Sequence, residues 1–111
     1  MKELLPLTEA FYYILVVLYS GDAHGYAIMQ DAERLSGGRV RIGAGTLYTA
    51  LGTLQKKGMI DYSAGVDNAD PRRKLYAITD TGRAVLRAEM DRLEELLENG
   101  RRAVRPIGGE R

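Results

Sequence analysis

The sequence predicts a mainly α-helical fold that contains one small β-hairpin. Three observations lead to this prediction: an amphipathic helical pattern over residues 44–57, two short alternating segments at 60–64 and 74–78, and a heptad-spaced apolar stripe after residue 80. A helix followed by a hairpin is the layout of a winged helix-turn-helix, so we expect that fold with an additional C-terminal helix. A core built from 111 residues is small enough for a second subunit to help bury apolar surface.

Residues 7–20 are expected to form the first helix, with Thr8 as its N-cap and Gly21 as its stop. This segment is apolar on nearly every side, because tyrosine and valine fill the positions between the core-facing ones. Helices of that kind are usually buried on more than one face. We therefore expect contacts with the chain's own core and with a partner subunit, the latter through Phe11 and Leu15.

A second helix is expected over residues 25–35, with Asp22 or His24 as its cap. The glycine pair after Ser36 predicts its end, because glycine readily adopts the left-handed backbone of a helix terminus. Residues 39–42 then alternate between arginine and an apolar side chain, which predicts a short strand.

The third helix, residues 44–57, divides into an apolar face of leucines and a polar face. The polar face carries residues at spacings of three, four and three: Thr46, Thr49, Thr53 and Lys56. Threonine hydroxyls and methyls suit contacts with base edges and phosphates, so we expect this face to bind DNA; a plain solvated helix face is the alternative. Tyr48 lies at its margin, either packed in the core or with its hydroxyl directed at a phosphate.

Residues 60–64 and 74–78 are expected to pair as two strands, because their apolar side chains recur at every second position. Turn-forming residues dominate the connection, and a cationic run ends it: Arg72, Arg73 and Lys74. Such side chains suit the DNA backbone or a narrow minor groove. Alternation places Lys74 on the side of Tyr76 and Arg73 on the other, so at most two of the three face one duplex.

Thr79 is expected to cap a last helix over residues 80–99, which Gly100 would end. Its apolar side chains follow the a and d rhythm of a coiled-coil seam: Leu86, Met90, Leu93 and Leu97. A stripe on a helix of about 30 Å must be buried against another chain or against the first helix. We expect it to form a dimer interface. Residues 101–111 are expected to be a frayed basic tail.

Positive charge is concentrated in one block and in the tail, although the net charge of the chain is only +1. Residues 34–74 carry eight basic and three acidic side chains (+5), and residues 101–111 carry four and one (+3); residues 1–33 and 75–100 sum to −4 and −3. A segregated basic face can hold phosphates on a nearly neutral protein. Ordinary solvated surface charge is the simpler alternative.

Residue types that several other functions require are missing from the sequence. The chain has no cysteine, which excludes disulfides and thiolate-bound metal, and its one histidine, His24, fits a helix cap or turn better than a base or ligand. No phosphate-binding glycine loop occurs. We therefore expect no cofactor, no metal and no enzymatic activity. The absence of a signal peptide and of a membrane-length apolar run favours a cytoplasmic protein without a membrane partner.

The order of several motifs resembles the PadR family of bacterial transcriptional regulators over about residues 4–99. The matching segments are His24-Gly25-Tyr26-Ala27-Ile28, Gly45-Thr46-Leu47-Tyr48-Thr49-Ala50-Leu51, Lys57-Gly58-Met59-Ile60 and Pro71 to Gly82. The resemblance implies a homodimeric winged-helix repressor on a palindromic operator, with a recognition helix at about 44–57 and a wing at about 64–74. It also implies that the helix after Thr79 packs on the first helix of the partner.

Two departures from the family pattern bear on function. Thr49 stands where the family often has proline after the tyrosine of the third helix. Some short members bind flat aromatic drugs with a tryptophan at the dimer interface, and this chain has no tryptophan. A small-molecule inducer would need a different pocket, for which the first helix offers Phe11, Tyr12, Tyr13 and Tyr19.

Together these observations predict a DNA-binding transcriptional regulator, with residues 1–79 as the winged-helix DNA-binding domain and residues 80–111 as the dimerisation helix and basic tail. Its partners would be double-stranded DNA and a second copy of the chain. Two alternatives stay open: a winged-helix module that binds a protein surface, and a sensor that sequesters a ligand without binding DNA.

Overall fold

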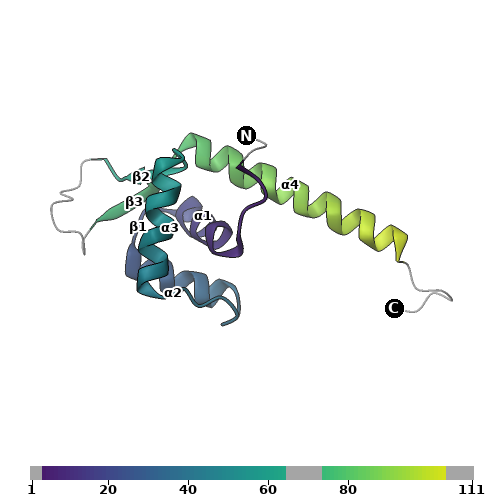
Figure 1. The fold of residues 1–111 in the computed structure, drawn as a ribbon, viewed down its shortest axis with the longest axis horizontal. Coiled ribbons are helices and arrows are strands. Elements are labelled where there is room, and N and C mark those ends of the chain that lie inside the picture. Colours follow the sequence, from purple (N-terminus) through teal and green to yellow (C-terminus); the bar gives the residue numbers. More distant parts are fainter. Residues whose placement is uncertain (1–3, 65–73, 105–111) are drawn as a thin grey trace.

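The computed structural model describes residues 4–64 and 74–104, and within them the chain is mainly helical with one small sheet (Figure 1). Its elements follow in the order α1 (Glu9–Ser20), β1 (Ala23–His24), α2 (Gly25–Leu35), α3 (Ala44–Lys56), β2 (Ile60–Tyr62), β3 (Leu75–Ile78) and α4 (Asp80–Ala103). The strands pair antiparallel in the order β1-β3-β2. This arrangement confirms the predicted mainly α-helical fold with a small sheet and a C-terminal helix.

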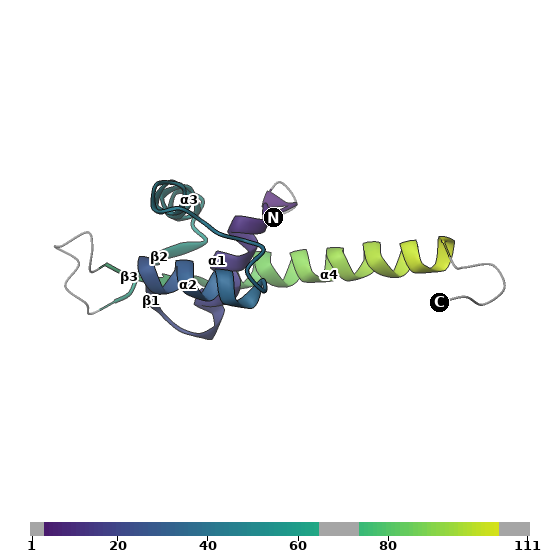
Figure 2. The same cartoon turned by 90° about the horizontal axis from the view of Figure 1, so that it is seen from below.

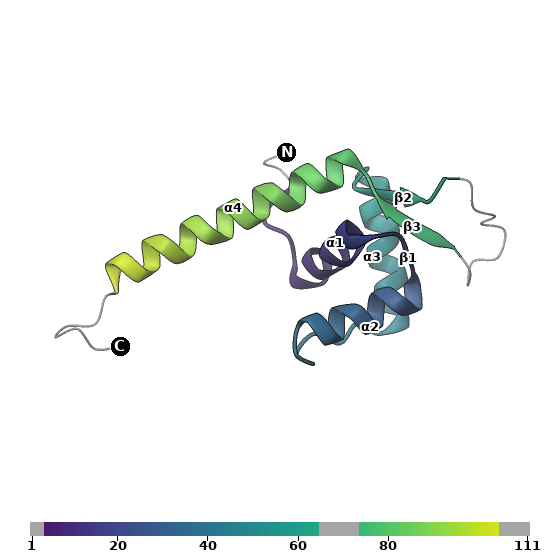
Figure 3. The same cartoon turned by 180° about the vertical axis from the view of Figure 1, so that it is seen from behind.

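Helix α1 lies between α2 and α4, as the views from the front and from behind agree, and α3 crosses one side of it (Figures 1 and 3). It contacts α2, α3, α4 and β3. Its residues Ile14, Leu15 and Leu18 are each at most 1 % exposed. A helix with neighbours on several sides has to be apolar nearly all round, which accounts for its unusual composition.

Two residues expected at a partner interface belong to this internal core instead. Leu15 is fully buried and Leu86 is 3 % exposed within a single chain. The prediction for these two residues is therefore corrected. Because α1 and α4 of one protomer pack directly on each other, the first part of the α4 stripe is already covered by the chain itself.

Threonine caps fix the start of two helices, as the sequence predicts. The Thr8 hydroxyl accepts a hydrogen bond from the Phe11 N–H at 3.1 Å, and the Thr79 hydroxyl accepts one from the Gly82 N–H at 3.0 Å. His24 is the N-cap of α2 by position, but its side chain makes no capping bond.

The predicted strand at residues 39–42 is wrong, and a two-residue strand elsewhere takes its place. In β1, Ala23 pairs with Tyr76 and His24 pairs with Leu75, so this strand covers the edge of β3. The 39–42 segment crosses from α2 to α3 without strand pairing. Its alternation arises because its arginines form ion pairs at the surface while its apolar residues turn toward the core.

Helix α4 runs further than predicted, through Gly100 to Ala103. The Arg102 side chain pairs with Glu98 at 3.5 Å across the position of this glycine. Ion pairs at this spacing support a helix. The 24 residues of α4 correspond to about 36 Å of helix, and its C-terminal half extends beyond the body of the molecule (Figure 1).

The end of α3 and the start of α4 meet at a tightly packed junction. Gly58 follows α3 with a φ of 77°, a conformation that residues with side chains rarely adopt. The Thr79 hydroxyl donates to the Gly58 carbonyl at 2.6 Å, and the Thr79 N–H donates to the Met59 carbonyl at 3.0 Å. A Cβ atom on Gly82 would lie 2.1 Å from the Met59 carbonyl oxygen. Only glycine therefore allows the first turn of α4 to approach this closely.

One carboxylate, that of Glu89 in α4, is buried in the fold. It is 2 % exposed, and its two oxygens accept hydrogen bonds from the Arg92 guanidinium at 2.6 and 2.9 Å. One of them also accepts the Leu7 N–H at 3.1 Å. The Arg92 bonds, assisted by that from Leu7, hold the pKa of Glu89 below its ordinary value although burial acts in the opposite direction. This carboxylate ties the segment before α1 to the middle of α4.

We expect Gly82→Ala to lower the free energy of unfolding by about 2–4 kcal/mol, because the new methyl group overlaps a backbone oxygen held by the sheet. Denaturant unfolding followed by circular dichroism measures the change. Gly100→Ala on the same helix is the matched control, since its Cβ meets no atom within 4 Å. Alanine favours helix there, so stability should stay equal or rise slightly. Equal stability of Gly82→Ala and the wild type would contradict the close approach.

We expect Glu89→Gln to lower the free energy of unfolding by about 1–3 kcal/mol at neutral pH, since it removes a buried charge from Arg92. The folded pKa is depressed, so this stabilisation is complete above the unfolded pKa of about 4.5 and is lost as pH falls through the lower folded pKa. The difference from the wild type should therefore shrink in acid. Unfolding curves across this range test it, with exposed Glu95→Gln as the control; a difference independent of pH would argue against a charged Glu89.

Candidate nucleic-acid interface

The polar face of α3 is exposed at the edge of the molecule. Figure 2 shows α3 at one edge of the molecule, next to strand β2. Its buried residues lie on one side: Leu47, Ala50, Leu51 and Leu54. Of the predicted site residues on the other side, three are exposed and one is half-buried: Thr46, Thr49 and Lys56, and Thr53. The structure therefore brings these four side chains together on one surface.

The threonine hydroxyls of this face differ in what they can still bind. Thr53 donates its hydroxyl hydrogen to the Thr49 carbonyl at 3.1 Å, inside the helix. Its oxygen keeps only acceptor capacity, which suits the amino group of adenine or cytosine. The hydroxyls of Thr46 and Thr49 have no hydrogen-bond partner among residues 4–64 and 74–104, so they can donate or accept.

Two lysines place unpaired positive charge at the end of α3. Lys56 and Lys57 are exposed and form no ion pair with any residue that the structure describes. Three arginines of the same positive block are paired within the chain: Arg34 with Asp31, Arg39 with Glu9, and Arg41 with Glu33. Up to the end of α3, the basic block thus divides into three locally paired arginines and two lysines that are available to phosphates.

Tyr48 is partly packed and partly exposed, so it combines features of the core residue and of the phosphate contact that the sequence left open. Its ring rests on the first turn of α2, where a Cβ on Gly25 would lie 2.6 Å from the Tyr48 hydroxyl oxygen and 3.0 Å from Cζ. The side chain is nevertheless 44 % exposed. Gly25 therefore provides a seat for the ring, and the open part of Tyr48 borders the face of α3.

The base of the hairpin is held by Lys74. Its amino group donates to the Tyr62 hydroxyl at 2.7 Å and lies 4.5 Å from the centre of that ring, and this bond lowers the pKa of Tyr62. The His24 Nδ1 donates to the Lys74 carbonyl at 3.0 Å. Tyr62 pairs with Tyr76 across the strands, so Lys74 lies on their side, as alternation predicts. Lys74 is thus half-buried rather than free, and Arg72 and Arg73 lie outside the described residues.

A groove that the sequence did not reveal runs between α3 and the start of α1. It has a volume of about 640 Å³, and α3 contributes Thr46, Thr49 and Thr53 to its wall. The opposite wall comes from α1 and includes Phe11, which is half-buried. Phe11, expected at a dimer interface, therefore lies on the side of α1 that faces α3.

The sequence matches the family model described as the transcriptional regulator PadR-like family over residues 14–88. The chain belongs to the PadR family. A transcriptional regulator from Clostridium thermocellum has a similar structure, with a TM-score of 0.71, 27 % identity and coverage of 86 % of this chain and 90 % of that one. This membership confirms the resemblance and the winged-helix fold, and it places the chain among regulators and not enzymes.

Two further relatives extend the comparison. Bacillus subtilis PadR in complex with operator DNA is similar at a TM-score of 0.64 and 25 % identity, over 77 % of this chain and 48 % of that one. This chain thus spans about half the length of that protein. Uncharacterized protein X of Lysinibacillus sphaericus is 33 % identical over 73 residues, which are 66 % of this chain and 67 % of the relative.

A row of large apolar side chains along α4 is exposed to solvent in the single chain. Their exposed fractions are 49 % for Met90, 42 % for Leu93, 54 % for Leu96, 55 % for Leu97 and 76 % for Val104. Val104 continues the heptad spacing seven residues after Leu97. Val104 was not predicted to belong to this stripe, because the helix was expected to end at residue 99.

A second groove of about 460 Å³ lies between α1 and α4 of the PadR-family chain. Two of the tyrosines expected to line a pocket are there, Tyr12 and Tyr19, together with Met90. Arg87 also lines the groove, donates to the Tyr19 hydroxyl and holds its guanidinium 5.4 Å from the centre of that ring. The groove therefore combines aromatic walls with a cation.

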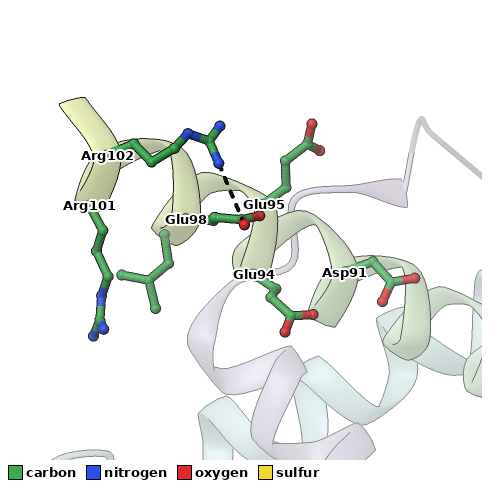
Figure 4. A pocket seen from close by; sticks show the side chains of 7 residues that line it. Asp91, Glu94, Glu95, Glu98, Arg101 and Arg102 are labelled. Carbon is green, nitrogen blue, oxygen red and sulfur yellow. Dashed lines mark ion pairs between the residues drawn. The ribbon is translucent and has the colours of Figure 1, made fainter.

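The acidic residues on the outer part of α4 diverge from one another. Figure 4 shows the side chains of Asp91, Glu94, Glu95 and Glu98 spreading from one helix in different directions. Among the residues that the structure describes, no group of three or more histidine, cysteine or acidic side chains is placed to hold a metal ion. Within those same residues, no helix combines the length and apolar character that a membrane span requires.

Proposed function

We propose that this PadR-family protein is a homodimeric DNA-binding regulator that represses transcription from a palindromic operator. The observation that supports this most is the polar face of α3, which is exposed, carries available hydroxyls and ends in unpaired Lys56 and Lys57. The similar Bacillus subtilis PadR was solved in complex with operator DNA, which supports the same partner for this chain.

In this proposal residues 1–79 form the DNA-binding domain, and α3 enters the major groove. Its threonine hydroxyls would contact base edges, while Lys56 would neutralise a phosphate. The exposed part of Tyr48 would face the backbone beside it. The hairpin would add Arg72 and Arg73 as contacts to phosphates or to the minor groove, with Lys74 steadying its base.

A second copy of the chain would cover the exposed stripe of α4, so residues 80–111 would form the dimerisation helix and tail. Met90, Leu93 and Leu97 are 42–55 % exposed, and a contiguous apolar stripe of this kind is stabilised by burial. Two-fold pairing would present two α3 helices to successive major grooves, about 34 Å apart. Dimer symmetry would then match the symmetry of the operator.

The groove between α1 and α4 is where an inducer would bind in this proposal. Its tyrosine walls suit a flat aromatic molecule, and Arg87 suits an acidic group on it. Because α4 would carry the dimer contacts, a ligand that wedges against it would favour a dimer with a different separation of the two α3 helices.

Selection of bound sequences from a random duplex pool, at low and at physiological salt, is the primary test. Enrichment of a palindromic sequence is the expected result. A chain that binds no duplex even at low salt would replace this proposal with one of its alternatives, a protein-binding module or a ligand-sequestering sensor. A pull-down and a thermal-shift screen would then distinguish those two.

We expect Lys56→Ala to weaken binding to all duplexes and to reduce the slope of log K against log salt by about 1 per lysine, or about 2 per dimer. The reason is that each phosphate contact releases condensed counterions. Fluorescence anisotropy over a salt series measures the slope. Arg102→Ala, which removes a cation of α4 paired with Glu98, is the matched control and should leave the slope unchanged. Identical slopes for Lys56→Ala and the wild type would remove Lys56 from the phosphate contacts.

We expect Leu93→Asp to convert the dimer to monomers, because a carboxylate would be buried without a partner in the α4 seam. Size-exclusion chromatography with light scattering measures the mass in solution. Leu35→Asp on α2 is the matched control, since Leu35 is exposed to a similar degree, 46 % against 42 % for Leu93. Persistence of the dimer in Leu93→Asp would show that subunits pair through another surface.

A further inference from the structure

Gly52 lies in the middle of α3, and the described residues give no structural reason for a glycine there. Its backbone is helical, whereas the glycines with positive φ are Gly37, Gly38 and Gly58. A Cβ on Gly52 would meet no atom of residues 4–64 or 74–104 within 4 Å, in contrast to the 2.1 Å contact found for Gly82. Neither backbone conformation nor close packing therefore requires glycine at this position.

This glycine weakens the helix that carries it. Glycine in an exposed helix interior is less favourable than alanine because it loses more backbone freedom on folding. Gly45, the other glycine of α3, lies in the first turn, so Gly52 is the one in the helix interior. The described chain offers no contact that offsets its cost. What Gly52 does provide is open space on the exposed face of α3.

The side chains around this open space suit a nucleic acid. Tyr48 and Thr49 lie one helical turn before Gly52, and Gln55 and Lys56 lie one turn after it. The surface of α3 thus has a depression at Gly52. The hydroxyl of Thr49 lies on one side of it, and the unpaired amino group of Lys56 lies on the other. An approaching base pair can come closer to the backbone of α3 here than at any position that carries a side chain.

We propose that Gly52 determines sequence specificity by seating one base-pair edge of the major groove against the backbone of α3. This inference rests on the proposed function, to which it adds a position that makes no hydrogen bond of its own. Thr49 and Lys56 would hold the neighbouring base edge and phosphate, and the absence of a side chain at residue 52 would set the depth of α3 in the groove. A side chain there would lift the helix away from one base pair in each half-site.

The test uses the full chain and the duplex that the wild type enriches from a random pool. We expect Gly52→Ala to bind that duplex about tenfold more weakly, in the range of a lost base-pair contact. It should bind an unselected random duplex as the wild type does, and its melting temperature should rise by about 3–6 °C. Gly100→Ala makes the same change in the exposed last turn of α4, again with no atom of the described residues within 4 Å. This control should also melt higher and should bind both duplexes like the wild type.

The possible results separate this inference from the proposed function. Affinities of Gly52→Ala and the wild type within about twofold on the selected duplex would overturn the inference and leave the proposed function intact. Equal weakening on selected and random duplexes would also overturn it, because a base-edge contact affects only the selected sequence. If the wild type enriches no sequence, the proposed function and this inference fail together.

Discussion

The hydrogen bonds between Thr79 and the backbone of Gly58 and Met59 fix where the main surfaces of this protein lie. At this point the end of α3, the last strand and the first turn of α4 are joined, and the missing side chain of Gly82 lets α4 rest on a carbonyl oxygen. This junction therefore fixes the orientation of α3 relative to α4. It also fixes where the polar face of α3 lies relative to the apolar stripe of α4.

Most of the fold could be predicted because its signals are local. Helical periodicity records which side of a segment is buried, and the caps Thr8 and Thr79 act within three residues of their own position. The two-residue strand β1 could not be predicted, since it carries too little alternation to form a pattern. The alternation at residues 39–42 wrongly predicted a strand for a different reason. Ion pairs with acidic side chains of other segments hold its arginines at the surface, which produces the same pattern.

The arrangement of the candidate site was predictable along α3 and less so around that helix. The spacing of Thr46, Thr49, Thr53 and Lys56 suffices to place them on one face, because a helix imposes its period. The seat of Tyr48 on Gly25 and the bond of Lys74 to Tyr62 depend on packing between distant segments, which no local pattern records. Burial of Leu15 and Leu86 in one chain likewise follows from how α1 and α4 cross, since a heptad stripe does not indicate which neighbour covers it.

Because α4 is long, a small rotation of this helix displaces α3 by a large distance. Its 24 residues form a helix of about 36 Å, which runs from the junction with α3 to an end beyond the body of the molecule. A rotation of α4 by about 5° about its C-terminal end would move α3 by about 3 Å. This distance is close to the rise of one base-pair step. A protein of this shape can lose its alignment with a duplex through a slight rocking of rigid bodies, with every internal hydrogen bond of each body intact.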